Sequence, residues 1–155
     1  MKIALIPVLV LALLTGCKSR DTVSVENHRN AAPVQSFSGP TLEDPLQFNR
    51  PSDPFKVHGE PTVNGNTLKI TVEYSGGCRE YDFQLVTNGM LMKSLPPQRP
   101  VRLIHLANED LCRRMIIDTL TFDLTPLAAP GGGRIKLNLQ ADREFYLDCV
   151  LDENH

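Results

Sequence analysis

The stretch of sequence that decides the fold is Thr67-Leu68-Lys69-Ile70-Thr71-Val72-Glu73-Tyr74. Apolar and polar residues alternate over all eight of its positions, so its four apolar side chains share one side. A period of two is typical of a β-strand with one buried and one exposed face. Residues 67–74 are therefore predicted to form a half-buried strand.

A second strand is predicted just before this one. Asn64-Gly65 favours a two-residue hairpin turn, because both positions tolerate a positive φ. The chain from Val57 to Val63 would then pair back on residues 67–74. Pro61 has no N–H to donate to a neighbouring strand, which restricts this first strand to the edge of a sheet.

The same alternation recurs in five segments further along the chain, and Asn88-Gly89 offers a second hairpin turn. The side chains predicted to face the core are Tyr81, Phe83 and Leu85; Val101, Leu103 and His105; Leu120, Phe122 and Leu124; Ile135, Leu137 and Leu139; and Phe145, Leu147, Cys149 and Leu151. Short strands separated by Gly, Pro and Asn predict an all-β fold, an antiparallel, immunoglobulin-like β-sandwich of seven to eight strands over residues 55–155. A small barrel is the alternative, and a single helical turn is expected at residues 108–115.

Upstream of this domain the composition changes. Residues 17–54 are polar, contain five prolines and show neither a helical nor an alternating period. Such a segment buries too little apolar surface to offset the entropy lost on ordering. We predict a flexible, Pro-rich tether, with a segment that folds on a partner as the alternative.

The start of the chain carries a secretion pattern. Met1-Lys2 is followed by an uncharged, largely apolar run over residues 3–14, which would be about 18 Å long as a helix. A bilayer core needs roughly 30 Å, so the run suits a signal peptide and not a membrane span. It ends in Leu14-Thr15-Gly16-Cys17, which resembles the lipobox of bacterial lipoproteins.

The resemblance implies that residues 1–16 are a signal peptide and that Cys17 becomes the lipid-bearing N-terminus. Cysteines of this family carry two or three acyl chains, enough for stable membrane attachment. In the family an aspartate after the cysteine commonly signals retention in the inner membrane, but Lys18 stands here. We therefore expect a cell-envelope protein anchored to the outer membrane, on a face that the sequence leaves open.

The composition and charge of the chain limit the classes of partner that it is expected to bind. The formal net charge is −2, with acidic and basic residues interspersed, and Trp is absent from the sequence. Without a basic stripe interleaved with aromatic residues, nucleic-acid binding is not expected. The membrane and an envelope protein remain as predicted partners.

Three cysteines follow the lipobox. Cys149 lies in register with core-facing residues and is predicted to be a buried thiol, whereas Cys78 and Cys112 lie in turn regions. We predict a Cys78–Cys112 disulfide, which an exported protein can form, with pairs involving Cys149 as the alternative. A reactive Cys112 or Cys78 would instead indicate a thiol-dependent enzyme.

His105, Glu109 and Asp110 form the one possible ligand loop in the sequence. The histidines lack metal-ligand spacing and no catalytic motif occurs, so neither a metal, a cofactor nor an enzymatic activity is predicted. Met90 and Met92 share a strand face and could bind Cu(I), although packing is the preferred interpretation.

Two segments of the mature chain, YSGGCREYDFQL at 74–85 and LTFDLTPL at 120–127, resemble small uncharacterised bacterial envelope lipoproteins. That resemblance implies export and a compact β domain but no activity. Together these patterns predict a lipid-anchored, non-enzymatic binding or structural module. The alternatives are a periplasmic metal or small-ligand carrier and, third, a thiol-dependent enzyme.

Overall fold

The computed structural model describes residues 36–153, so the predicted signal peptide and Cys17 lie outside the described residues. Nine strands, one short helix and one 3-10 turn make up this part of the chain. Their bounds are β1 Ser36–Gly39, β2 Thr41–Glu43, α1 Pro45–Phe48, β3 Lys56–Asn64, β4 Thr67–Gly76, β5 Asp82–Thr87, β6 Gln98–Leu106, β7 Arg114–Asp123, η1 Thr125–Leu127, β8 Gly133–Gln140 and β9 Glu144–Leu151.

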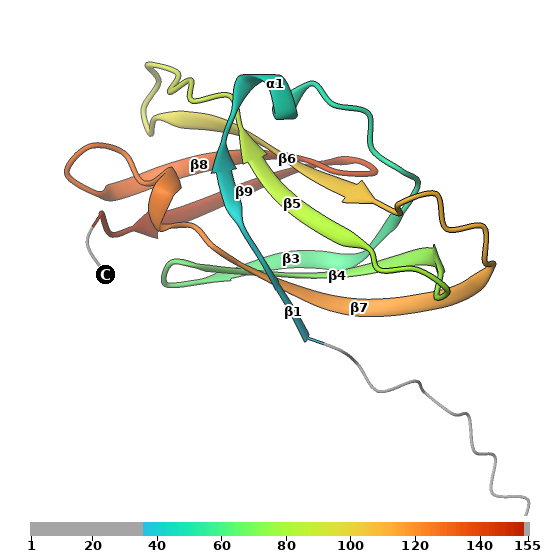
Figure 1. Cartoon of the computed structure of the whole chain (residues 1–155). Coiled ribbons are helices and arrows are strands. Elements are labelled where there is room, and N and C mark those ends of the chain that lie inside the picture. Colours follow the sequence, from blue (N-terminus) through green and yellow to red (C-terminus); the bar gives the residue numbers. More distant parts are fainter. Residues whose placement is uncertain (1–35, 154–155) are drawn as a thin grey trace, which may run out of the picture. The chain divides into compact units, whose positions relative to one another are not determined.

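The strands form two sheets, with the orders β1-β7-β4-β3 and β2-β5-β6-β8-β9. The two sheets lie one above the other in Figure 1 and enclose one cluster of buried apolar side chains between them. The predicted all-β sandwich is therefore confirmed. The sheets are mixed and hold nine strands, so they differ from the expected seven to eight antiparallel strands: the pairs β1–β7, β2–β5 and β6–β8 run parallel and the others antiparallel.

The hairpin of β3 and β4 forms as the alternation predicts. Val57 pairs with Val72 and Val63 with Leu68, and the core-facing side chains of β4 are all buried. The register shifts between His58 and Thr62, a segment that includes Pro61. As predicted, β3 is an edge strand.

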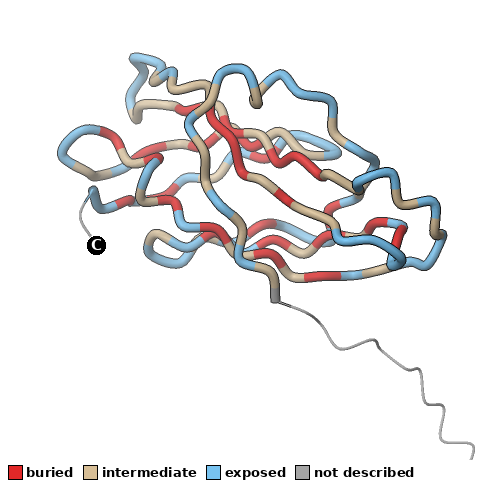
Figure 2. Tube along the Cα trace, viewed as in Figure 1, coloured by how far each residue is buried: buried red, intermediate tan, exposed pale blue. Residues whose placement is uncertain are grey.

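The remaining predicted strands become β5 to β9, and their inward residues supply most of the core. Buried stretches follow the inner faces of both sheets in Figure 2. Phe83 from β5 and Phe122 from β7 are the largest fully buried side chains. Because both sheets contribute to one core, the loops at each end of the sandwich are held close together.

The prediction of a flexible tether over residues 17–54 is wrong for residues 36–54, while residues 17–35 lie outside the described residues. In the sandwich, β1 pairs with β7 and β2 with β5, so the chain passes from one sheet to the other at Pro40. A Cβ at Gly39 would lie 2.6 Å from Phe122, which is why this crossing needs a glycine. Strands of three or four residues are too short to show a period, and the backbone of the neighbouring strand satisfies their hydrogen bonds.

Two local expectations also fail. Asn88-Gly89 does not close a tight hairpin, since β5 pairs with β6 across a connection that spans residues 88–97. Residues 108–115 form no helical turn, because Asn108 and Glu109 have φ values of 51° and 57°. Those left-handed values are incompatible with a right-handed helix.

Candidate functional site

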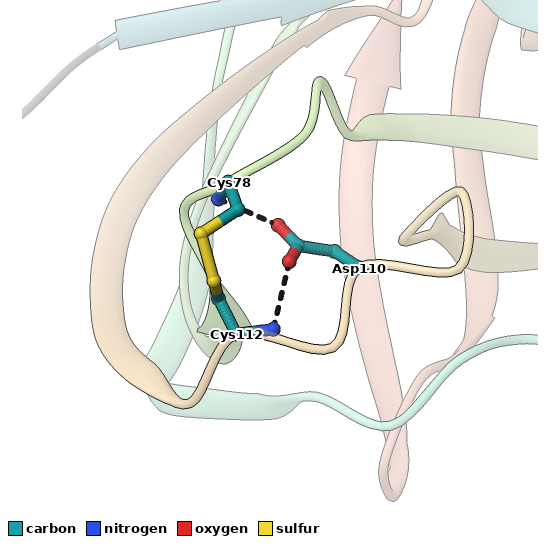
Figure 3. Close-up of side chains that lie close together, drawn as sticks. All are labelled: Cys78, Asp110 and Cys112. Atoms are coloured by element: carbon teal, nitrogen blue, oxygen red, sulfur yellow. Dashed lines mark hydrogen bonds between the residues drawn. A yellow bond between two sulfur atoms is a disulfide. The ribbon is translucent and has the colours of Figure 1, made fainter.

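The Cys78–Cys112 disulfide joins the β4–β5 and β6–β7 loops at one end of the sandwich, with 5.9 Å between the two Cα atoms, and confirms the predicted pairing. Asp110 ties the same loops together without a covalent bond. Its Oδ2 accepts hydrogen bonds from the backbone N–H groups of Gly77, Cys78 and Arg79 at 2.8, 2.9 and 2.9 Å. Its Oδ1 accepts the N–H of Cys112 at 2.9 Å (Figure 3).

These four donors fix the charge of Asp110. The hydrogen bond from Cys112, followed by those from Cys78 and Arg79, lowers the pKa of the carboxyl to about 2. Gly77 has a φ of +105°, a value that favours glycine, and this turns successive N–H groups toward one oxygen. The four backbone N–H groups thus form an anion-binding site that the Asp110 carboxylate occupies.

Two strained residues precede Asp110. Asn108 and Glu109 both adopt the left-handed conformation, which costs on the order of 1 kcal/mol for each residue without a glycine. Asn108 is held through its side chain and its backbone: Nδ2 donates to the Glu80 carbonyl, and the backbone carbonyl accepts from Arg79 Nη1, each at 2.9 Å. The loop therefore has one defined shape.

The predicted ligand-loop residues His105, Glu109 and Asp110 come together around one pocket of about 270 Å³. Its full lining is Asp53, Pro54, Ser75, His105, Ala107, Glu109, Asp110, Leu111 and Cys112. Asp53, which the sequence pattern does not single out, accepts the Ala107 N–H at 2.7 Å through Oδ2. The pocket thus contains three carboxylates and no lysine or arginine.

His105 lies at the buried side of this pocket, with only 1% of its surface exposed. Its ring stacks on Phe83 at 4.4 Å between centroids and lies 4.9 Å from the ring of Tyr74. Burial lowers the pKa of His105, although hydrogen bonding to the backbone of Pro54 and the charge and backbone of Asp53 act in the opposite direction. Both ring nitrogens are fully buried; the backbone groups of Pro54 and Asp53 lie close enough to stabilise the protonated ring, but within residues 36–153 neither nitrogen makes a well-aligned hydrogen bond.

A buried hydrogen-bond network lies in the interior between the sheets near His105. Oδ2 of Asp118 accepts the hydroxyl protons of Tyr74 and Tyr81 at 2.6 and 2.7 Å. Burial raises the pKa of both tyrosines, and their hydrogen bonds to Asp118 raise it further. Sequence reasoning missed Asp118, although it stands two residues before Leu120 on the inward side of β7.

One group of possible metal ligands converges in the part of the chain that the structure describes. The ligand atoms of Cys78, Asp110 and Cys112 lie within 4.8 Å of one another. The two sulfurs form the disulfide and the carboxylate accepts four N–H groups, so all three residues are already engaged. Burial raises the pKa of the remaining thiol, Cys149, to about 11, as expected for an unreactive core cysteine.

Apolar side chains are exposed beside the pocket. Leu111 is 90% exposed, and Met115 and Ile117 on the outer side of β7 are 62% and 49% exposed. A second pocket, of about 180 Å³, contains Phe55 and Met115 and shares Pro54 with the first. We call Pro54, Phe55, Leu111, Met115 and Ile117 the disulfide-end surface.

Met90 and Met92, for which packing was the preferred interpretation, are 58% and 39% exposed and do not belong to the buried core. They line a groove of about 320 Å³ on the five-stranded sheet, together with Phe48 and Tyr146. The methionines lie in the long β5–β6 connection. Between them, Leu91 is partly buried and packs against the core.

No protein-family model matches the chain, and no curated protein matches its sequence. Solved structures do resemble it. A protein from Parabacteroides distasonis described as toxin-related aligns with a TM-score of 0.52 at 14% identity, over 78% of this chain and 62% of its own. A NigD-like immunity protein from Bacteroides caccae aligns with a TM-score of 0.50 at 16% identity, over 75% of this chain and 59% of its own.

The chain therefore spans about three-fifths of the length of these two proteins, and the likeness shows a shared β fold. A protein from Bacteroides fragilis described as a lipoprotein aligns at a TM-score of 0.41 with 8% identity, over 77% of this chain and 71% of its own. Within residues 36–153, no helix has the length and apolar character needed to cross a membrane.

Proposed function

We propose that this chain is a lipid-anchored, non-enzymatic module of the cell envelope that binds a protein partner through its disulfide-end surface. The observation that carries the proposal is the exposure of Leu111, Met115 and Ile117 next to the loops that the Cys78–Cys112 disulfide joins. Contiguous exposed apolar side chains with a polar rim are typical of protein-interaction sites.

The rigidity of the loops supports the same conclusion. The disulfide and the four hydrogen bonds to Asp110 hold Leu111 in place before any partner arrives. A preorganised surface loses less conformational entropy on binding, so more of the contact energy appears as affinity. The description of the similar Bacteroides caccae structure as an immunity protein is compatible with a binding role.

The lipobox at Leu14-Thr15-Gly16-Cys17 supports attachment through acyl chains on Cys17, after removal of residues 1–16. Lys18 supports placement at the outer membrane. The sandwich begins at Ser36, so residues 18–35 would join the anchor to the domain.

The two alternatives have less support. A metal carrier needs free donor atoms, but the converging group of Cys78, Asp110 and Cys112 is already engaged. A thiol-dependent enzyme needs an accessible thiolate, but Cys78 and Cys112 are bonded to each other and Cys149 is buried with a raised pKa.

The test is cross-linking in intact cells, followed by purification of the full chain through a C-terminal tag. The triple variant Leu111→Ser, Met115→Ser, Ile117→Ser removes the apolar surface. A matched control, Leu46→Ser with Leu95→Ser, removes side chains that are 86% and 100% exposed elsewhere. We expect one dominant envelope protein with wild type and control, and its loss with the triple variant; equal recovery from all three would contradict the proposal.

A further inference from the structure

The Cys78–Cys112 disulfide lies at the surface of the domain. Cys78 is exposed and Cys112 is half-buried, whereas the third cysteine of the described chain, Cys149, is buried in the core. In Figure 3 the disulfide and the Asp110 carboxylate link the same two loops side by side. Exposed disulfides exchange with thiols more readily than buried ones, and labile, regulatory disulfides belong to this exposed group.

The charges around the disulfide nearly cancel. The two loops and the first residue of β7 carry three arginines and three carboxylates: Arg79, Arg113 and Arg114, and Glu80, Glu109 and Asp110. Asp110 has an oxygen within 4.8 Å of both sulfurs, but four backbone N–H groups stabilise its charge. An anionic thiolate therefore encounters no net negative charge as it approaches the exposed Cys78.

The loop that carries Leu111 depends on the disulfide for its shape. Leu111 lies between Asp110, which is held by hydrogen bonds, and Cys112, which is held by the covalent bond. Three of the four hydrogen bonds to Asp110 are exposed to solvent, where water competes for the same N–H groups. The left-handed conformations of Asn108 and Glu109 also oppose the folded shape of the loop. Opening the disulfide would therefore allow this loop to unfold locally while the sandwich stays intact.

We infer that the disulfide is a redox-sensitive clamp on the disulfide-end surface, which a dithiol reductant opens in the folded protein. The inference rests on the proposed function, because it concerns the regulation of that same binding surface. Once the clamp is open, Leu111 loses its preorganised position and the loop must be ordered again on binding. The reduced form should therefore bind the partner about tenfold more weakly than the oxidised form.

Opening the clamp is a two-step exchange. A thiolate of the reductant attacks Sγ of the exposed Cys78, the Sγ–Sγ bond breaks, and the electron pair leaves on Sγ of Cys112, which takes up a proton. The second thiolate of the reductant then displaces Cys78 from the mixed disulfide, and Sγ of Cys78 takes up a proton in turn. Two cysteine thiols are formed, and the dithiol is oxidised to its own disulfide.

The first experiment treats the full chain in detergent micelles with dithiothreitol in the absence of denaturant. Alkylation followed by mass spectrometry should label Cys78 and Cys112 and leave Cys149 unlabelled, with an unchanged far-UV circular dichroism spectrum. Trypsin should cleave after Arg113 at least about tenfold faster in the reduced form. Cleavage after the exposed Lys93, in the β5–β6 connection, should proceed at the same rate in both forms. Reduction that requires an unfolding concentration of urea, labelling of Cys149, or equal cleavage after Arg113 would overturn the inference.

The second experiment separates the clamp from the proposed function through capture of the envelope partner in intact cells. The variant Cys78→Ser with Cys112→Ser has a permanently open clamp, and Cys149→Ala is the matched control. We expect about tenfold lower recovery of the partner with the double variant and unchanged recovery with the control. The purified wild type is compared before and after reduction in the same way, so the result does not depend on the folding of a variant.

The outcomes distinguish the two claims. Full recovery with the open clamp, together with loss of capture by Leu111→Ser, Met115→Ser, Ile117→Ser, would support the binding surface and overturn the clamp. No specific partner with the wild type would contradict the proposed function, and the trypsin assay would still decide whether reduction opens the loop.

Discussion

Removing the disulfide should cost the domain a large part of its stability. The change is the paired substitution Cys78→Ser with Cys112→Ser, which keeps the size of both side chains nearly constant. The covalent link closes a loop with a sequence separation of 34 residues. In the chain-entropy treatment, opening a loop of that length returns about 4 kcal/mol of entropy to the unfolded chain at 25 °C. Small domains have total stabilities of roughly 5–15 kcal/mol, so this loss is readily measured.

The assay is urea unfolding at neutral pH, with and without dithiothreitol. Reduction should lower the stability of the wild-type chain to that of the double variant and leave the variant unchanged, which makes the reductant a matched control. A loss below about 1 kcal/mol would refute the reasoning, since the chain-entropy treatment requires several times that amount. It would mean that the hydrogen bonds to Asp110 alone hold the two loops.

Three further results are expected. Tyr74→Phe removes a hydrogen bond to the buried Asp118 and should lower the free energy of unfolding in urea by about 2 kcal/mol. The folded pKa of Tyr74 is raised, so its contribution to stability is present below pH 10 and is lost as the pH rises above 10. The free energy of unfolding of the variant should therefore fall less steeply at alkaline pH than that of the wild type. Asp110→Asn should make the stability of the domain fall less steeply at acid pH. The carboxyl has a folded pKa of about 2 and an ordinary pKa of 3.8, so it stabilises the fold above pH 3.8 and loses that contribution as the pH falls toward 2. The same acid unfolding curve for variant and wild type, followed by circular dichroism, would contradict this. In the denatured, unreduced mature chain, alkylation should modify Cys149 alone, and labelling of Cys78 would disprove the pairing.

The longer strands could be predicted from sequence because one face of each is buried. In β4 the four apolar side chains from Leu68 to Tyr74 all point into the core, so the period of two is complete. Strands β1 and β2 could not be predicted in this way. They are three or four residues long, and partners distant in sequence, β7 and β5, supply their hydrogen bonds.

The candidate site was predictable in part. The disulfide followed from the placement of its cysteines, and His105, Glu109 and Asp110 do gather around one pocket. The role of Asp110 was not predictable, because four backbone N–H groups converge on it through the left-handed residues of the two loops. Asp118 could have been singled out from the sequence, because it is a charged residue at an inward-facing position of an alternating strand.

The central claim is that the disulfide-end surface binds a protein in the cell envelope. The most direct measurement is site-specific photo-cross-linking in intact cells from position 111, with position 95, a leucine that is 100% exposed against 90% for Leu111, as the matched control. We predict one dominant adduct with an envelope protein from Leu111 and none of that mass from Leu95. No adduct from position 111, or the same adducts from both positions, would contradict the claim.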